Sequence, residues 1–328
     1  MSQFNKTTSD EVEPTAKRPR VEDSLTDKAT IANQSLAWKN LETFICDQVK
    51  IVDQSNIRQI FRNLLQVNLI RGRGLLANAI IEAQKNSPKY TNVYAAFVYI
   101  INSKFPRIGK LICGRVISLY RESFVANERK NTFILIKFLA HLINQKVLHE
   151  KIAFEIVDVL LRNVSSDSVK LAVQFLTECG QKLLRENKKE LDSRFSKLSD
   201  LLNGPLITQH TKNMIIVLLT ERRNRFQVHS TSQSTLNLVN ENDKNVHRLE
   251  CLHLCDREIV LDTFQYDEEY EVNEYLYKEF LKTIVDENSD DKDETNLNSL
   301  QNNNDQSNIP AVDTDMASSG STVADKEN

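Results

Sequence analysis

The sequence predicts an all-α protein: a HEAT-like α-helical solenoid, that is, a crescent of antiparallel helix pairs, with disordered N- and C-terminal tails. Only 7 Gly and 6 Pro occur in 328 residues, which favours long helices over hairpins that need glycine turns. From Leu36 to about Arg225, apolar residues recur at spacings of three and four, the period of half-buried helices. The segment starting at Ile100 also matches the one starting at Leu142, an offset of 142 − 100 = 42 residues. Two-helix HEAT units repeat at about this period.

Residues 1–34 are polar and charged without a hydrophobic period, so we expect a disordered arm. This arm contains a basic cluster, Lys17, Arg18, Pro19 and Arg20. Clusters of this kind in accessible backbone are typical of nuclear import signals, although a solvated charge run has the same composition. The cluster predicts a nuclear protein.

A HEAT-like middle domain is expected over residues 35–227. Pro106 suits the first turn of a helix, and Thr91 suits an N-cap. Gly180 is expected to be a helix C-cap glycine, and Gly204 with Pro205 to stop the next helix. The apolar stripes predict helices around 57–65, 75–83, 93–103, 106 onward, 131–145, 149–161, 167–179, 189–202 and 208–225.

Downstream of this domain we expect a polar linker at 228–250 and a C-terminal extension at 251–285. The extension is amphipathic but too small to fold alone, so it should pack on the solenoid or on a partner. Residues 286–328 contain 11 acids and 2 lysines, a net charge of −9, and are expected to be a disordered acidic tail. The rest of the chain then carries −3 + 9 = +6, a charge that suits a component of a nucleoprotein assembly.

Nothing in the sequence indicates catalysis, a cofactor or a bound metal, so we expect no enzyme. The Arg71-Gly72-Arg73-Gly74 segment lacks the strand and glycine spacing of a phosphate-binding loop and is expected to form a turn between helices. His247, Cys251, His253 and Cys255 offer zinc-binding atoms, but their spacing matches no common finger. The chain has no apolar run near the ~20 residues of a membrane span, and its five scattered cysteines suit a reducing compartment.

Basic residues fall near several predicted turns, where a solenoid would align them along one edge. Direct RNA binding by such an edge would also need stacking aromatics, and the aromatic residues lie mostly on core stripes. A partner-facing or solvated edge is therefore preferred over an RNA site, which stays as an alternative.

Four stretches closely resemble the nucampholin family of pre-mRNA-splicing factors, also named as complexed with the Cef protein: residues 69–76 (LIRGRGLL), 93–96 (VYAA), 100–106 (IINSKFP) and 137–145 (KFLAHLINQ). Weaker similarity extends the resemblance over about residues 36–285. It implies a middle domain of the initiation factor four gamma type, a crescent of HEAT-like pairs. In this family that domain grips the DEAD-box RNA helicase of the exon junction complex, holds its lobes apart and delivers it to the spliceosome.

This chain departs from the pattern of that family in two places. Family members typically carry a second helical domain downstream, where this chain has its acidic tail. Their loop after the first helix commonly reads Asn-Lys and touches the helicase, whereas the aligned residues here are Lys50 and Ile51. A translation or mRNA-decay scaffold that binds a different helicase is a further alternative. The residues expected to face a partner are Lys50, Arg71, Arg73, Lys104, Asn144 and Lys146.

Overall fold

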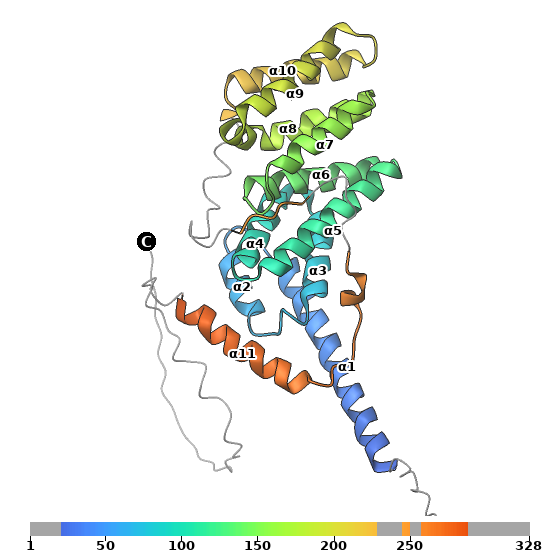
Figure 1. Ribbon diagram of the computed structural model, residues 1–328, viewed down its shortest axis with the longest axis vertical. Helices are drawn as coiled ribbons and strands as arrows, with labels where there is room; N and C mark the ends of the chain where they lie inside the picture. Colours follow the sequence, from blue (N-terminus) through green and yellow to red (C-terminus); the bar gives the residue numbers. More distant parts are fainter. Residues whose placement is uncertain (1–20, 228–244, 250–256, 288–328) are drawn as a thin grey trace, which may run out of the picture. The chain divides into compact units, whose positions relative to one another are not determined.

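The computed structural model describes residues 21–227, 245–249 and 257–287. Eleven α-helices and short 3-10 turns make up the regular structure of these residues, which confirms the predicted all-α class (Figure 1). A single isolated β-bridge joins Leu148 and His247 within the same ranges. None of the described helices combines the length and apolar character needed to cross a membrane. The predicted import cluster at 17–20, most of the linker and nearly all of the acidic tail lie outside the described residues.

The helices follow one another along the chain with short connections. Their bounds are α1 (Val21–Lys50), α2 (Ile57–Leu64), α3 (Arg73–Asn86), α4 (Thr91–Lys104), α5 (Pro106–Val125), α6 (Arg129–Asn144), α7 (Lys151–Arg162), α8 (Ser166–Glu186), α9 (Lys188–Asp200), α10 (Gln209–Arg223) and α11 (Tyr270–Glu287).

Helices α4, α6, α8 and α10 pack side by side in one layer, while α3 packs on α5 and α7 packs on α9 in the other (Figure 1). Each helix of the first layer also contacts a neighbour in the second, as α4 does with α5 and α8 with α9. This is the HEAT-like arrangement of helix pairs that the 42-residue repeat predicts. One continuous apolar core runs through the stack from Trp38 to Phe226 and takes in Tyr277 and Ile284 of α11.

Local sequence signals mark the starts of four helices, α5, α8, α9 and α10. Pro106 is the first residue of α5, where its missing N–H costs no hydrogen bond. Ser165 and Ser168 form a reciprocal capping box at the start of α8, and the Asn187 side chain caps α9. The Thr208 side chain accepts from the Thr211 amide and caps α10. Thr91 is not the expected N-cap, because it is already the buried first residue of α4 and its hydroxyl donates to the Pro88 carbonyl.

Helix α1 begins at Val21, so residues 21–34 are helical where a disordered arm was predicted. The sequence signal was weak because this stretch has no apolar stripe. A long-range contact accounts for part of the order. The Gln34 side chain is buried, accepts from the Asp267 amide at 3.0 Å and donates to the Asp267 carbonyl at 2.8 Å. Asp267, the hydrogen-bond partner of Gln34 in α1, thus lies 233 residues farther along the sequence.

Gly180 lies inside α8, which continues to Glu186, so the prediction of a C-cap glycine there is wrong. The reason for glycine is packing. A Cβ at this position would lie 2.5 Å from Cζ of Phe226, whose ring is buried against the helix just beyond the end of α10. Gly180 therefore allows α8 and the end of α10 to approach closely.

Residues 257–284 pack along the first helices of the stack. These residues are held in place by Arg115, which is buried in α5. Arg115 donates hydrogen bonds to the carbonyls of Arg257 (2.8 Å), Glu258 (3.0 Å) and Gly74 (3.1 Å). Its Nη1 also lies 2.8 Å from Asp262 Oδ1. Farther along, the Phe280 ring meets the Phe105 ring edge-on at 5.7 Å. The extension thus adds to the core of the stack, with contacts on α3, α5 and the α4–α5 turn.

Candidate partner-binding edge

Lys50 is the last residue of α1 and Ile51 is the first residue of the turn to α2; both are exposed. Lys50 pairs with Asp47 one turn back on α1 at 3.2 Å, and both side chains are more than half exposed. Asp53 fixes the turn by accepting from the Ser55 and Asn56 amides at 2.7 and 2.9 Å. The Ser55 hydroxyl and these two amides lower the pKa of Asp53. This turn is an ordered loop that presents one cation and one apolar side chain to solvent.

Arg71 lies against aromatic rings of α1 and α11. The Arg71 guanidinium is 5.7 Å from the Trp38 ring centroid and 4.4 Å from that of Tyr270 in α11. Arg71 Nη2 is buried. Arg73 begins α3 and donates to the Ile70 carbonyl at 2.8 Å. The structure therefore places Arg71 in a contact with the C-terminal extension.

Helices α4 and α6 pack against each other, and their C-terminal ends, which contain Lys104 (α4) or precede Lys146 (α6), are joined by a third segment. Residues 245–249 join the two ends. Asn102 Nδ2 donates to the Asn245 carbonyl at 2.6 Å, and Asn102 Oδ1 lies 2.6 Å from His247 Nε2. The His247 amide donates to the Val147 carbonyl at 2.8 Å, and the His149 amide donates back to the His247 carbonyl at 3.0 Å.

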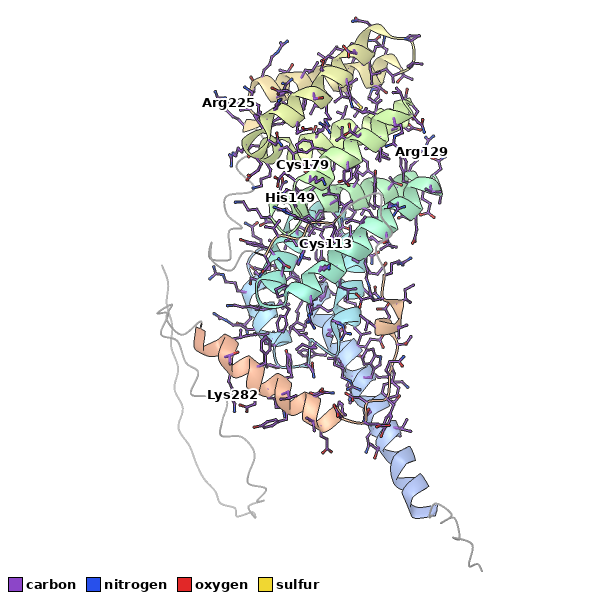
Figure 2. The ribbon with its side chains drawn as sticks, in the orientation of Figure 1. Cys113, Arg129, His149, Cys179, Arg225 and Lys282 are labelled. Carbon is purple, nitrogen blue, oxygen red and sulfur yellow. The ribbon has the colours of Figure 1, made fainter. Side chains whose placement is uncertain are left out.

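We call the C-terminal ends of α4, α6 and α8, with the turns that follow them, the turn edge (residues 102–105, 144–150 and 185–188). Figure 2 shows His149 and Arg225, which follow α6 and α10, on one side of the stack and Arg129, at the start of α6, on the other. Burial, and next the charge of Lys110, lowers the pKa of His247. The turn edge contains four cations, Lys104, Lys146, Arg185 and Lys188, and two acids, Glu150 and Glu186.

Asn144 faces inward from the turn edge. Its Nδ2 donates to the Glu178 carbonyl of α8 at 2.9 Å and so ties α6 to α8. The Glu178 carboxylate pairs with Lys137 and His141 of α6, both at 3.1 Å. Burial opposes the charge on Glu178, but the hydrogen bond and charge of His141 and the charge of Lys137 outweigh it and lower the pKa to about 2.

Replacing Glu178 with glutamine is expected to destabilise the protein at neutral pH by about 1–3 kcal/mol, because Lys137 and His141 lose a carboxylate that is mostly buried. A lowered folded-state pKa stabilises the fold above the unfolded pKa near 4.5, and this contribution is lost as the pH falls toward 2. Urea unfolding at several pH values would measure the free energy. The wild type should lose more stability than Glu178→Gln between pH 4.5 and 2. Equal losses would show that Glu178 has no depressed pKa.

Two residues that contact the turn edge, His247 and Glu178, were not among the predicted partner residues. The sequence analysis singled out His247 only as one of four possible zinc-binding residues. The other three, Cys251, His253 and Cys255, lie outside the described residues. Within the described part of the chain, no group of three or more His, Cys, Asp and Glu residues is placed to hold a metal ion. Glu178 belongs to a helix surface whose partners come from another helix, which periodicity does not identify.

The MIF4G domain model matches residues 50–245. Relatives are named as splicing factors: the pre-mRNA-splicing factor CWC22 homolog of Xenopus laevis is 39% identical over 280 residues, covering 85% of this chain and 35% of that protein. The Homo sapiens homolog is 38% identical over 278 residues, 85% of this chain and 31% of the relative. The male determiner protein Mdmd(Y) of Musca domestica is 36% identical over 273 residues, 83% of this chain and 23% of the relative.

This chain spans about a third of the length of the first two of these relatives. An alignment that covers 280 of the 328 residues must include residues 49–280, and so takes in helices α2–α10, the turn edge and most of the C-terminal extension. With a family model that covers residues 50–245 and an all-helical stack of the expected kind, the chain belongs to the MIF4G domain family and is similar to CWC22-type pre-mRNA-splicing factors.

Proposed function

We propose that this protein is a spliceosome-associated scaffold in pre-mRNA splicing. It binds the DEAD-box RNA helicase of the exon junction complex, holds the helicase open and delivers it for assembly of that complex. The observation that carries this proposal is similarity to proteins named pre-mRNA-splicing factors over 85% of the chain. A MIF4G scaffold domain supports a role in binding and not in catalysis. A nuclear location follows from a splicing role and is consistent with the basic cluster at 17–20.

Two surface features offer contacts for the helicase. The ordered α1–α2 turn presents Lys50 and Ile51, at the position where the resembling family has its helicase-contacting Asn-Lys pair. The turn edge adds Lys104 and Lys146, whose positive charge would favour an acidic surface on the partner and raise the association rate. Binding that favours the open helicase would lower its ATPase rate by shifting the population toward that state.

We expect the full chain to bind the exon-junction helicase and to suppress its RNA-stimulated ATPase activity. Reversing two charges at the turn edge (Lys104→Glu with Lys146→Glu) should weaken binding about tenfold or more, because both substitutions place a carboxylate opposite an acidic partner. Titration calorimetry and a coupled ATPase assay would measure the two effects.

The matched control reverses Lys89 and Lys130, which are exposed at the opposite ends of α4 and α6. This variant changes the net charge equally and should bind like the wild type. If both double variants lose affinity equally, the turn edge is not the binding surface. If the wild-type chain does not bind the helicase, the proposed scaffold function is wrong for this partner. Binding to RNA without the helicase, steeply weakened by salt, would favour the direct RNA-binding alternative.

A further inference from the structure

A basic pocket lies between the second half of α8, α9 and the end of α10, and it includes Arg185 and Lys188 from the end of the turn edge. Its volume is about 970 Å³. Five cations and one acid are among the residues that line it, a balance of 5 − 1 = +4: Arg185, Lys188, Arg222, Arg223, Arg225 and Asp192. The four residues proposed above to contact the helicase, Lys50, Ile51, Lys104 and Lys146, do not line this pocket.

Arg222 is held in place within the pocket. Its guanidinium lies 4.5 Å from the centroid of the Phe195 ring and forms an ion pair with Asp192. The side chains of both charged residues are partly exposed, so they still line the cavity. Stacking and pairing fix the plane of the guanidinium, which lowers the entropy lost when it binds a ligand. The pairing also neutralises the one acid of the lining.

The remaining four cations, Arg185, Lys188, Arg223 and Arg225, are exposed. Among the described residues, none of the ion pairs involves any of the four. Their charge is therefore not balanced at short range by this part of the protein. Burying a phosphate among them would relieve their mutual repulsion and form charge-assisted hydrogen bonds.

The backbone that carries Arg223 and Arg225 is anchored. Arg225 and Phe226 have φ values of 53° and 55°, and the Phe226 amide donates to the Glu221 carbonyl at 2.8 Å to close the end of α10. The Phe226 ring is buried against Gly180 and packs edge-on to Phe195 at 6.4 Å. The sharp turn thus holds the two arginines at the rim of the pocket by means of a buried ring.

We propose that this pocket binds a phosphorylated peptide segment, with phosphoserine phosphates held by the arginine cluster. Guanidinium groups match phosphate oxygens with paired hydrogen bonds, and arginine clusters are a recurring way to recognise phosphorylated peptides. Leu184 and Leu219 give the pocket an apolar wall that peptide side chains would cover and a bare polyphosphate would not. Single-stranded RNA is disfavoured, because no aromatic ring is among the described residues that line the pocket, and the nearby Phe195 and Phe226 are buried.

The test uses the full chain and a short fluorescent Gly-Ser peptide with two phosphoserines. Fluorescence anisotropy should detect binding of this peptide and at least tenfold weaker binding of the same peptide without phosphate. The variant Arg185→Gln with Arg223→Gln removes two exposed cations without placing an acid at a helix end. It should weaken binding of the phosphopeptide by about tenfold.

The matched control is Arg58→Gln with Arg62→Gln, which removes the same charge from the exposed face of α2 and should leave binding unchanged. Circular dichroism would confirm that both variants are folded. Equal binding of the phosphorylated and unphosphorylated peptides would overturn the proposal, as would equal losses in the two variants. A single-stranded RNA of equal charge that binds more tightly than the phosphopeptide, and loses affinity in the pocket variant, would make this an RNA site instead. Displacement of the peptide by an equal concentration of inorganic phosphate would reduce it to a simple anion site and also overturn the proposal.

Discussion

Replacing Arg115 with methionine is expected to lower the free energy of unfolding by about 3 kcal/mol and to free residues 257–284 from the helical stack. Arg115 is 2% exposed and donates to three carbonyls, of Gly74, Arg257 and Glu258, beside the Asp262 carboxylate. Methionine fills a similar volume but donates nothing, so these acceptors lose their partner within the protein. Removing one member of a buried charged pair typically costs about 3–5 kcal/mol.

The expected loss lies at the low end of that range for a structural reason. The acceptors at Arg257, Glu258 and Asp262 belong to the extension, which can move away from the stack and expose them to water. Urea unfolding would give the change in stability. Hydrogen–deuterium exchange should show faster exchange in 257–284 while α8 and α10 stay protected.

The matched control for this prediction is Arg107→Met, an exposed arginine near the start of the same helix. It should change stability by less than about 0.5 kcal/mol, the usual range for a surface substitution. If Arg115→Met leaves both the unfolding midpoint and the hydrogen exchange of residues 257–284 unchanged, the packing of the extension does not depend on the hydrogen bonds of Arg115.

The fold was predictable from local signals because helical period and turn chemistry depend on residues close in sequence. Pro106 marks the start of α5, and the apolar stripe from Ile57 predicts α2 at its observed start. The 42-residue repeat predicted that the turns at Lys104 and Lys146 hold equivalent places, and the structure puts the ends of α4 and α6 side by side. Repetition carries this long-range information because each unit packs on the next in the same way.

Contacts between segments far apart in sequence were not predictable in this way. Gly180 looks like a helix stop until the ring of Phe226, 46 residues later (226 − 180 = 46), is placed against it. Arg71 looks like an exposed turn residue until Tyr270 is placed over it. In both cases the deciding partner lies outside the window in which period or capping is visible. The same limit explains why the C-terminal extension was expected to pack somewhere but without a stated surface.

The second large effect is expected from Gly74→Ala, because α3 and the C-terminal extension touch through their backbones at this residue. A Cβ on Gly74 would lie 2.2 Å from the Leu261 carbonyl oxygen and 2.7 Å from Asp262 Oδ1. The oxygen of Leu261 belongs to the main chain and cannot rotate away as a side chain would. The 3-10 turn Ile259–Asp262 must therefore shift away from α3.

Two opposing contributions decide the size of this effect. Alanine near the start of α3 favours the helix by about 0.5–1 kcal/mol relative to glycine, whereas forcing an extra methyl into a close contact typically costs about 1–3 kcal/mol. We expect a net loss of about 1–2 kcal/mol by urea unfolding, with faster hydrogen exchange in 257–284. Gly204→Ala is the matched control, because the nearest atom to its added Cβ is 3.9 Å away.

Combining Gly74→Ala with Arg115→Met tests whether the cost of Gly74→Ala comes from its contact with the extension or arises within α3. Once Arg115→Met has freed residues 257–284, the methyl group that Gly74→Ala adds no longer meets the Leu261 carbonyl. The destabilisation caused by Gly74→Ala should then largely disappear. The double variant should therefore be less destabilised than the sum of the single variants, by an interaction energy of about 1 kcal/mol or more. Strict additivity would mean that Gly74→Ala acts within α3 alone and that the contact with Leu261 does not hold the extension in solution.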